Sequence, residues 1–516
     1  MSETRFSLRE IARIDFRSNV QHVPPHMPPS VQKATTKFLG TRASVVNLVG
    51  DEQWQILRQA GHDLRLHTIT HLDYYLEMLE ENVTKAGGHV HWARDAAEAR
   101  RIVLEIARRA SRNVKRAVKV KSMATEEIGL NHFLIDAGIQ TLETDLGEFI
   151  VQLAGVGPSH IIAPAVHLTK EGIAALFREK LGVDAPTDPI QLAAIARAKL
   201  REEFLAADMG ISGANFLVAE TGTLVIVSNE GNGRMCTTLP PLHVAVVGID
   251  KVVPDMESLN VLLKLLSRSA TGQKMSAYTS FITGPRRTDA ENGPQEFHLI
   301  LLDNGRTRIL QDEIARETLL CIRCGVCLNV CPVYNNVGGH AYGWAYSGPI
   351  GAILAPQLLG TKVAGHLPFA SLLCGACAEY CPVKIPIPEI LLRLRHRVVE
   401  GDRVSGPSAS PVLRAAAEVG GRTLGLPWLY EFGTQLLRVV QAPLRKDGWL
   451  PNLPPPLNRW TMSRPLPAFG ADFRDWWRDR TPEGRQHNLE RKIGLGALAV
   501  GLVALAAWLL ARKKNC

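Results

Sequence analysis

Seven cysteines confined to one short segment constrain this chain more than any other feature of its sequence. Of the nine cysteines, seven lie between Cys321 and Cys381, and only Cys236 and Cys516 lie elsewhere. A disulfide framework is typical of small secreted domains and uses an even, distributed set of cysteines. The clustering therefore indicates a set of metal ligands.

The first cysteine run has the spacing of a bacterial ferredoxin. It reads Cys321-x-x-Cys324-x-x-Cys327-x-x-x-Cys331-Pro332. In such a run, three closely spaced thiolates hold one cluster and the fourth reaches over to the other. Soft thiolates at this spacing favour iron-sulfur chemistry, whereas structural zinc usually takes two CxxC pairs or a Cys/His mixture. A zinc knot is the alternative that the complete four-cysteine run disfavours.

The second run, Cys374-x-x-Cys377-x-x-x-Cys381-Pro382, repeats this motif without its first position, where Ser371 stands. The crossed pattern predicts two ligand sets, namely Cys321, Cys324, Cys327 and Cys381 for cluster one, and Cys331, Cys374 and Cys377 for cluster two. Cluster two is one thiolate short. It is therefore either a 3Fe-4S centre or a 4Fe-4S cluster whose odd iron is held by Ser371, water or a partner group.

Length and composition indicate a globular protein of several domains. The chain has 516 residues, which predicts about three domains. Hydrophobic residues make up 46% and charged residues 21%, and the formal net charge is +9, too small an excess for a dedicated nucleic-acid-binding surface. The first 20 residues are charged throughout and lack the apolar core of a secretory signal. We therefore expect most of the chain to lie in a reducing cytoplasm.

The order of patterns along the chain predicts five segments. Short apolar runs such as AVKV, IQTLET, HIIAPAV, LHVAVVGI and FHLILLD alternate with helical periodicity, which predicts a largely parallel sheet. Two further β-rich runs flank Thr221-Gly222, as in a hairpin. We expect an extended N-terminal arm over 1–50, an α/β domain over 51–305, a dicluster segment over 306–400, a helical and proline-rich region over 401–490, and an apolar helix over 491–514.

The chain resembles the lactate-utilisation protein B family. The resemblance covers roughly residues 30–400 and rests on CIRCGVCLNVCPVY, GHAYGWAYSGPIGAIL and LCGACAEYCPVKIPI, with VKSMATEEIGLN, ETDLGEFIVQLAG, SHIIAPAVHLTK and AETGTLVIVSNEGNGR in the α/β part. It implies a lactate-utilisation (LUD) domain, similar in fold to ribose-phosphate isomerase and CoA-transferase domains. The long insertion between the cysteine runs suggests an α-helical ferredoxin domain. The missing cysteine at Ser371 belongs to the family pattern.

The resemblance implies an iron-sulfur component of a three-protein system that oxidises L-lactate to pyruvate. Oxidising a 2-hydroxy acid removes two electrons, whereas each cluster passes one, so a two-electron acceptor must lie elsewhere. No complete GxGxxG, GxxxxGK[ST], HExxH or GxSxG motif supplies one in this sequence. We therefore expect an electron-transfer subunit that works with partner proteins and a respiratory acceptor. Alternatives are a subunit for glycolate or D-lactate oxidation, and a non-enzymatic redox sensor or scaffold.

Weaker signals lie in the α/β domain. Glu143, Asp145 and Glu148 follow a strand, where ligand sites of open sheets form, and residues 230–234 make a glycine-rich loop able to approach an anion. Turn chemistry alone also explains such glycines. His67 and His71 have metal-binding i, i+4 spacing, although packing on a helix face is the commoner reason for it.

The C-terminus predicts a membrane anchor. Ile493 to Ala511 are 19 uncharged residues, bracketed by basic residues on both sides. At 1.5 Å per residue this length approaches the ~30 Å hydrocarbon core. A buried terminal helix is the alternative, since Gly and Ala are frequent in this stretch. We expect the clusters to lie at the cytoplasmic face, attached to the membrane by this segment.

Overall fold

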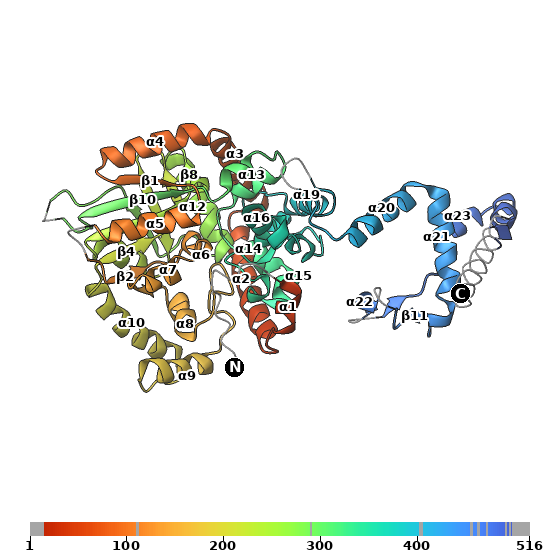
Figure 1. The fold of residues 1–516 in the computed structure, drawn as a ribbon, viewed down its shortest axis with the longest axis horizontal. Helices are drawn as coiled ribbons and strands as arrows, with labels where there is room; N and C mark the ends of the chain where they lie inside the picture. Colours follow the sequence, from red (N-terminus) through yellow and green to blue (C-terminus); the bar gives the residue numbers. More distant parts are fainter. Residues whose placement is uncertain are drawn as a thin grey trace, which may run out of the picture. The chain divides into compact units, whose positions relative to one another are not determined.

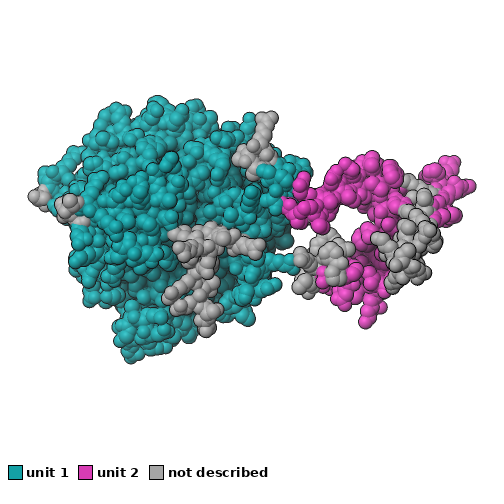
Figure 2. Space-filling view, viewed as in Figure 1, with its two compact units in different colours: residues 1–408 teal, residues 409–516 magenta. Residues whose placement is uncertain are grey.

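The computed structural model describes residues 15–109, 113–288, 291–401, 406–454, 458–461, 465–470 and 473–490, together with 493, 494 and 497. The chain divides into two compact units, which Figure 2 shows in different colours. Unit 1 comprises residues 1–408 and unit 2 comprises residues 409–516.

The centre of unit 1 is a six-stranded sheet whose neighbouring strands all run parallel. In spatial order its strands are β1 (His89–Ala93), β10 (Glu296–Leu302), β7 (Leu242–Gly248), β4 (Met209–Ser212), β2 (Arg116–Lys119) and β3 (Gln140–Glu143). Every residue of β7 is buried, as expected for a parallel strand covered on both faces. The predicted α/β domain with a parallel sheet is confirmed.

Alternate residues of the central strand face two different layers. Val244 and Val246 pack in the same core cluster as residues of α5 (Ala96–Ala107) and α7 (Leu130–Asp136), whereas Ala245 and Val247 pack with those of α4 (Leu72–Lys85). The other helices of this region are α3 (Asp51–Thr70), α6 (Met123–Glu127), α8 (Leu146–Ala154), α9 (Lys170–Leu181), α10 (Pro189–Leu205), α11 (Asn232–Thr238) and α12 (Met256–Ala270).

A second, smaller sheet contains the predicted hairpin. Strands β5 (Phe216–Val218) and β6 (Thr223–Ser228) pair antiparallel around Gly222, whose φ of +66° suits glycine. Strands β8 (Val252–Val253) and β9 (Tyr278–Ile282) complete this sheet in the order β8-β5-β6-β9. The hairpin prediction is confirmed.

Two local expectations are wrong. The run HIIAPAV over 160–166 is a loop, in which the Ser159 backbone N–H donates to the Pro164 carbonyl at 3.0 Å. The N-terminal arm is helical rather than extended, with α1 (Phe16–Gln21) and α2 (Met27–Asn47). Prolines occupy the first turn of α2, where their missing N–H groups cost nothing.

Residues 306–401 form helices and 3-10 turns, without a strand. The α-helices are α13 (Arg306–Leu310), α14 (Val326–Val330), α15 (Pro332–Val337), α16 (Gly348–Leu359), α17 (Thr361–Ala364), α18 (Ala376–Tyr380) and α19 (Ile387–Glu400), and the 3-10 helices are η3 (Ala315–Leu320), η4 (His340–Tyr342) and η5 (Leu367–Phe369). Figure 1 shows α14, α15 and α16 gathered with α1 and α2 beside the α/β domain. Helix α16 lies at the centre of this segment, since all its residues but the last are buried.

Unit 2 contains short elements. Its helices include α20 (Pro411–Gly425), α21 (Pro427–Val440), α22 (Asn458–Thr461) and α23 (Phe473–Arg478), with one turn of 3-10 helix, η6 (Ala442–Leu444), and residues 482–490 are helical as well. Strands β11 (Trp449–Leu450) and β12 (Leu466–Pro467) pair antiparallel. In the described part of the chain, no helix is long and apolar enough to cross a membrane. The predicted anchor, 493–511, lies outside the described residues except at 493, 494 and 497, so it stays a prediction.

Candidate metal centre

The first three cysteines lie on one tight turn that leads into α14. Between Cys321 and Cys327 the backbone adopts left-handed conformations at Arg323 (φ 61°) and Gly325 (φ 77°). A non-glycine residue with positive φ is uncommon and marks a locally constrained turn. This turn brings Cys321, Cys324 and Cys327 onto one side of the loop.

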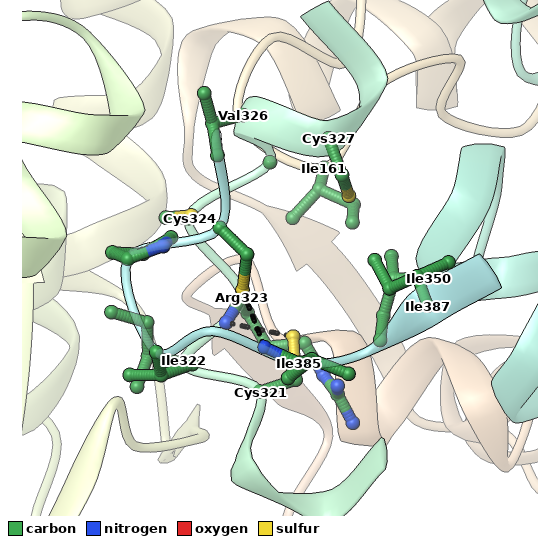
Figure 3. Close-up of a pocket in the computed structure, with 14 residues that line it drawn as sticks. Ile161, Cys321, Ile322, Arg323, Cys324, Val326, Cys327, Ile350, Ile385 and Ile387 are labelled. Carbon is green, nitrogen blue, oxygen red and sulfur yellow. Dashed lines mark hydrogen bonds between the residues drawn. The ribbon is translucent and has the colours of Figure 1, made fainter. Parts of the chain in front are cut away.

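These three cysteines share a cavity with Cys381, although Cys381 belongs to the second run. The cavity lies between the turn of the first run and the residues that follow Cys381 (Figure 3). Its other lining residues are largely apolar, and include Ile161, Ile322, Val326, Ile350, Ile385 and Ile387. The structure therefore brings together the four cysteines that the crossed pattern groups.

The second run repeats the local geometry of the first. Leu373 (φ 54°) and Gly375 (φ 83°) hold the positions that Arg323 and Gly325 hold in the first run, and a one-turn helix follows each loop. Helices α14 and α18 also contact each other. The two runs thus form a structural repeat.

Within this repeat, Ser371 occupies the place of Cys321. The backbone N–H of Arg323 donates to the Sγ of Cys321 at 3.4 Å. In the second run, the backbone N–H of Leu373 donates to the Oγ of Ser371 at 3.1 Å. The serine oxygen therefore lies where the first run has a cysteine sulfur.

The second group of thiols lies nearer the surface. Cys331 is buried, Cys377 is half-buried and Cys374 is exposed. Burial, and after it the neighbouring Cys331 and Cys374, raise the pKa of the Cys377 thiol to about 12. Cys331, Cys374 and Cys377 are thus close enough to influence one another.

Burial keeps the thiols of Cys324, Cys327 and Cys381 protonated in the absence of metal. It raises the pKa values of Cys324 and Cys327 well above that of a free cysteine, and that of Cys381 to about 11. Thiolate, not thiol, is the metal ligand, so binding must release these protons. Metal loading at this site is consequently expected to depend on pH.

A buried tyrosine gives an independent indication that a further group belongs between the two runs. Tyr342 is completely buried, and within the described residues its hydroxyl has no hydrogen-bond partner. Burial, then the charges of Cys331, Tyr334 and Cys327, raise the pKa of this phenol. Buried hydroxyls are normally satisfied, and that of Tyr334 donates to the Ser159 carbonyl at 2.7 Å. The Tyr342 hydroxyl thus suits an acceptor beside the cysteines, such as cluster sulfur.

In the described regions, no three His, Cys, Asp or Glu side chains are close enough to hold a single metal ion. In a 4Fe-4S cluster each thiolate binds a different iron, so its ligands need not converge on one atom.

Buried and half-buried cations surround the first group. The Nζ of Lys251 donates to the Cys321 carbonyl at 2.9 Å, and the Nε of Arg58 donates to the Cys381 carbonyl at 2.9 Å. Arg323 is half-buried beside Asp250, with its guanidinium over the Tyr346 ring at 4.8 Å. Positive charge at this position stabilises an anionic group in the cavity.

Comparisons with known proteins agree with this geometry. Residues 76–302 match the LUD domain and residues 317–385 match the 4Fe-4S dicluster domain. The chain is 44% identical to lactate utilization protein B of Shouchella clausii, over 89% of this chain and 95% of the relative. It is 47% identical to that of Macrococcus caseolyticus, over 84% and 90%. The chain belongs to the lactate utilization protein B family.

The solved structure of a DUF162 family protein from Deinococcus radiodurans also aligns with this chain. The alignment covers 45% of this chain and 98% of that one, at 14% identity and a TM-score of 0.26. This similarity is too weak to support a conclusion about this chain. The dicluster domain instead assigns iron-sulfur clusters of the 4Fe-4S class to this family member.

The LUD domain of this family member contains a second polar cluster. Lys119 and Glu143 form a fully buried ion pair at 2.6 Å, and Lys121 lies 3.5 Å from Glu148. Burial raises the pKa of Glu148 to about 8, and it raises that of Glu230, whose carboxylate accepts from the Leu146 N–H, to about 7. Of the residues that the sequence singled out, the structure brings Glu143 close to Glu148, and it brings Glu230 of the loop 230–234 close to Asp145.

Other expectations fare differently. The rings of His67 and His71 lie 4.5 Å apart and tilted, and His67 forms a hydrogen bond with the Tyr75 hydroxyl at 3.0 Å on an exposed helix face. Sequence reasoning missed Tyr342 and the cations around the first group as functional residues. Tyr342 stands in GHAYGW, whose position between the two cysteine runs was the only available signal.

Proposed function

We propose that this protein is an electron-transfer subunit in the oxidation of L-lactate to pyruvate, and that it acts in a complex with partner proteins. The observation that carries the proposal is the meeting of four cysteines from two runs in one apolar cavity. The names of the relatives, which refer to lactate utilization, support the choice of substrate.

We assign the ligands from the geometry. Cluster one takes Cys321, Cys324, Cys327 and Cys381, which share the cavity. Cluster two takes Cys331, Cys374 and Cys377, and Ser371 supplies its fourth ligand, because its oxygen holds the position of the Cys321 sulfur. When bound, such clusters accept and release one electron at a time.

The chain's own residues prepare the two sites differently. Around cluster one, buried Arg58 and half-buried Lys251 and Arg323 supply positive charge, which favours the more negative, reduced state. At cluster two, exposed Cys374 leaves the site open to a partner's redox group. We therefore assign electron exchange with partner proteins to the side of cluster two.

The test is anaerobic reduction by substrate. The purified holoprotein, mixed with its partner subunits and L-lactate, should give the EPR signal of reduced clusters. Matched mixtures with D-lactate, with glycolate, and with L-lactate but without the partners should give little signal. If L-lactate failed to reduce the clusters while dithionite did so, the proposed substrate would be wrong. If no substrate reduced them, a sensor or scaffold would fit better.

We also propose where the protein is located in the cell. The apolar stretch from Ile493 to Ala511 would attach the protein to the cytoplasmic face of the membrane, near a respiratory acceptor. Basic residues on both sides of the stretch do not fix its orientation by the positive-inside rule.

A further inference from the structure

Unit 2 differs from unit 1 in its charge and its aromatic content. It holds 16 of the 59 Lys and Arg residues and 8 of the 50 Asp and Glu residues, and so accounts for +8 of the net charge of +9. It also holds six of the nine tryptophans. Basic residues combined with tryptophan are typical of protein surfaces at membrane interfaces.

Helix α23 exposes three aromatic side chains on one face, and we call Phe473, Trp476 and Trp477 the aromatic patch. Their i, i+3 and i+4 spacing places them side by side. Ring centroids lie 5.3 Å apart for Phe473 and Trp476, and 5.8 Å apart for Phe473 and Trp477. All three side chains are more than half exposed. Water is an unfavourable environment for a contiguous aromatic surface of this kind.

Ion pairs behind the helix hold the aromatic patch in place. Arg474 and Arg478 both contact the buried carboxylate of Glu431 on α21, at 3.4 and 2.6 Å. The Arg480 guanidinium lies 4.1 Å from the centre of the Trp477 ring. The patch is therefore a packed feature of unit 2, with a cation at its edge.

Another exposed tryptophan of unit 2 lies close in sequence to basic residues. Trp449 of β11 is about half exposed, and Arg445 and Lys446, just before it, are exposed as well. Indole rings prefer the headgroup level of a bilayer, and each Lys or Arg near an anionic surface adds attraction. Trp449 with its basic neighbours, like the aromatic patch with Arg480, thus combines an exposed indole ring with positive charge.

We propose that unit 2 binds the surface of a bilayer containing anionic lipids, with the aromatic patch inserted at headgroup level. The charge of unit 2 is complementary to such a surface. The uncharged stretch that starts at Ile493 follows α23 after only 14 residues, so a membrane lies within reach. A protein partner is the competing occupant. This binding needs no cluster, so it stands or falls separately from the proposed electron transfer.

The test uses a chain ending at Leu489, which lacks the apolar stretch, and vesicles of defined lipid. The truncated chain should sediment with vesicles of phosphatidylcholine and phosphatidylglycerol, but not with phosphatidylcholine alone. High salt should release it. Replacing Arg445 and Lys446 by Gln should weaken binding by about fivefold for each charge removed.

Variants distinguish the aromatic patch from exposed tryptophan in general. The double change Trp476→Ala and Trp477→Ala should abolish most binding. Trp92→Ala is the matched control, because Trp92 is exposed on unit 1, and it should leave binding unchanged. If the double variant misfolds, the milder changes Trp476→Phe and Trp477→Phe in the truncated chain should remove most of the quenching of tryptophan fluorescence by brominated lipid. Equal binding to neutral vesicles, or vesicle binding absent while partner subunits still bind unit 2, would overturn the proposal.

Discussion

At Ser371, an oxygen takes the place of the sulfur that Cys321 provides in the first run, while the surrounding backbone stays the same. Oxygen is a harder ligand than sulfur and changes the potential and the lability of the iron it holds. Under the ligand assignment that we propose, the two clusters thus differ in one ligand atom that stands on the same local backbone. The sequence indicates the substitution, but only the structural repeat indicates where the oxygen lies.

Converting Ser371→Cys should therefore supply the missing thiolate and give a cluster two that is more stable in air. Iron content after exposure to oxygen and the EPR spectrum of cluster two measure this. Ser371→Ala is the control, which should favour loss of one iron. If Ser371→Cys leaves both the spectrum and the iron content unchanged, Ser371 does not face the cluster.

Tyr342 yields a second prediction at the residue scale. A hydroxyl that donates to cluster sulfur stabilises the reduced state, so Tyr342→Phe should lower the midpoint potential of cluster two. The expected shift is on the order of 50 mV, equivalent to a hydrogen bond of about 1 kcal/mol in a one-electron couple. EPR-monitored redox titration measures it.

Tyr334→Phe is the matched control for this change, because its hydroxyl already donates to the Ser159 carbonyl. It should leave both potentials close to those of the unaltered protein. Equal shifts in the two variants would mean that general packing, rather than a hydrogen bond from Tyr342, sets the potential.

At the scale of elements, the periodicity of apolar residues predicted the strands and helices whose formation depends mainly on local sequence. Strands β2, β3, β7 and β10, the hairpin around Gly222 and α12 behind its Asp255 cap follow from local patterns, whereas β1 and β4 were not predicted. The run 160–166 was misread because its apolar residues are buried for another reason. Nearby Ser159 contacts Tyr334 and Gly339 of the dicluster segment, so burial there comes from packing between domains rather than from a strand.

The candidate site likewise contains residues that the sequence predicted and residues that only the structure revealed. The spacing of the cysteines was enough to group them, because in ferredoxin-type runs the spacing indicates which cysteines bind the same cluster. Lys251 lies 70 residues from Cys321, and Arg58 lies 323 residues from Cys381. No local pattern links residues so far apart, so these cations required the structure.

The crossing of the two runs makes a prediction about Cys381. Cys381→Ser should damage cluster one, although Cys381 lies on the second run, because it lines the cavity of the first. We expect loss of about half the iron and of the cluster-one EPR signal. Cys236→Ser, at a buried cysteine outside both runs, should change neither. An alteration of cluster two alone would refute the ligand assignment.

At the scale of the whole molecule, we expect the stretch from Ile493 to Ala511 to attach the protein to the membrane. Full-length protein should remain with membranes in high salt, whereas a chain ending at Leu489 should be released, because 19 uncharged residues insert where charge attraction alone does not. Fractionation with retained cluster spectra measures this. Recovery of both forms in the high-salt soluble fraction would argue against the anchor.

The central claim is that seven cysteines hold two iron-sulfur clusters in one chain. Anaerobic analysis of iron and acid-labile sulfide tests it most directly. Two clusters with the proposed ligands predict about seven to eight irons per chain and a similar amount of sulfide. About one zinc per chain without sulfide would contradict the claim, and with it the proposed electron transfer.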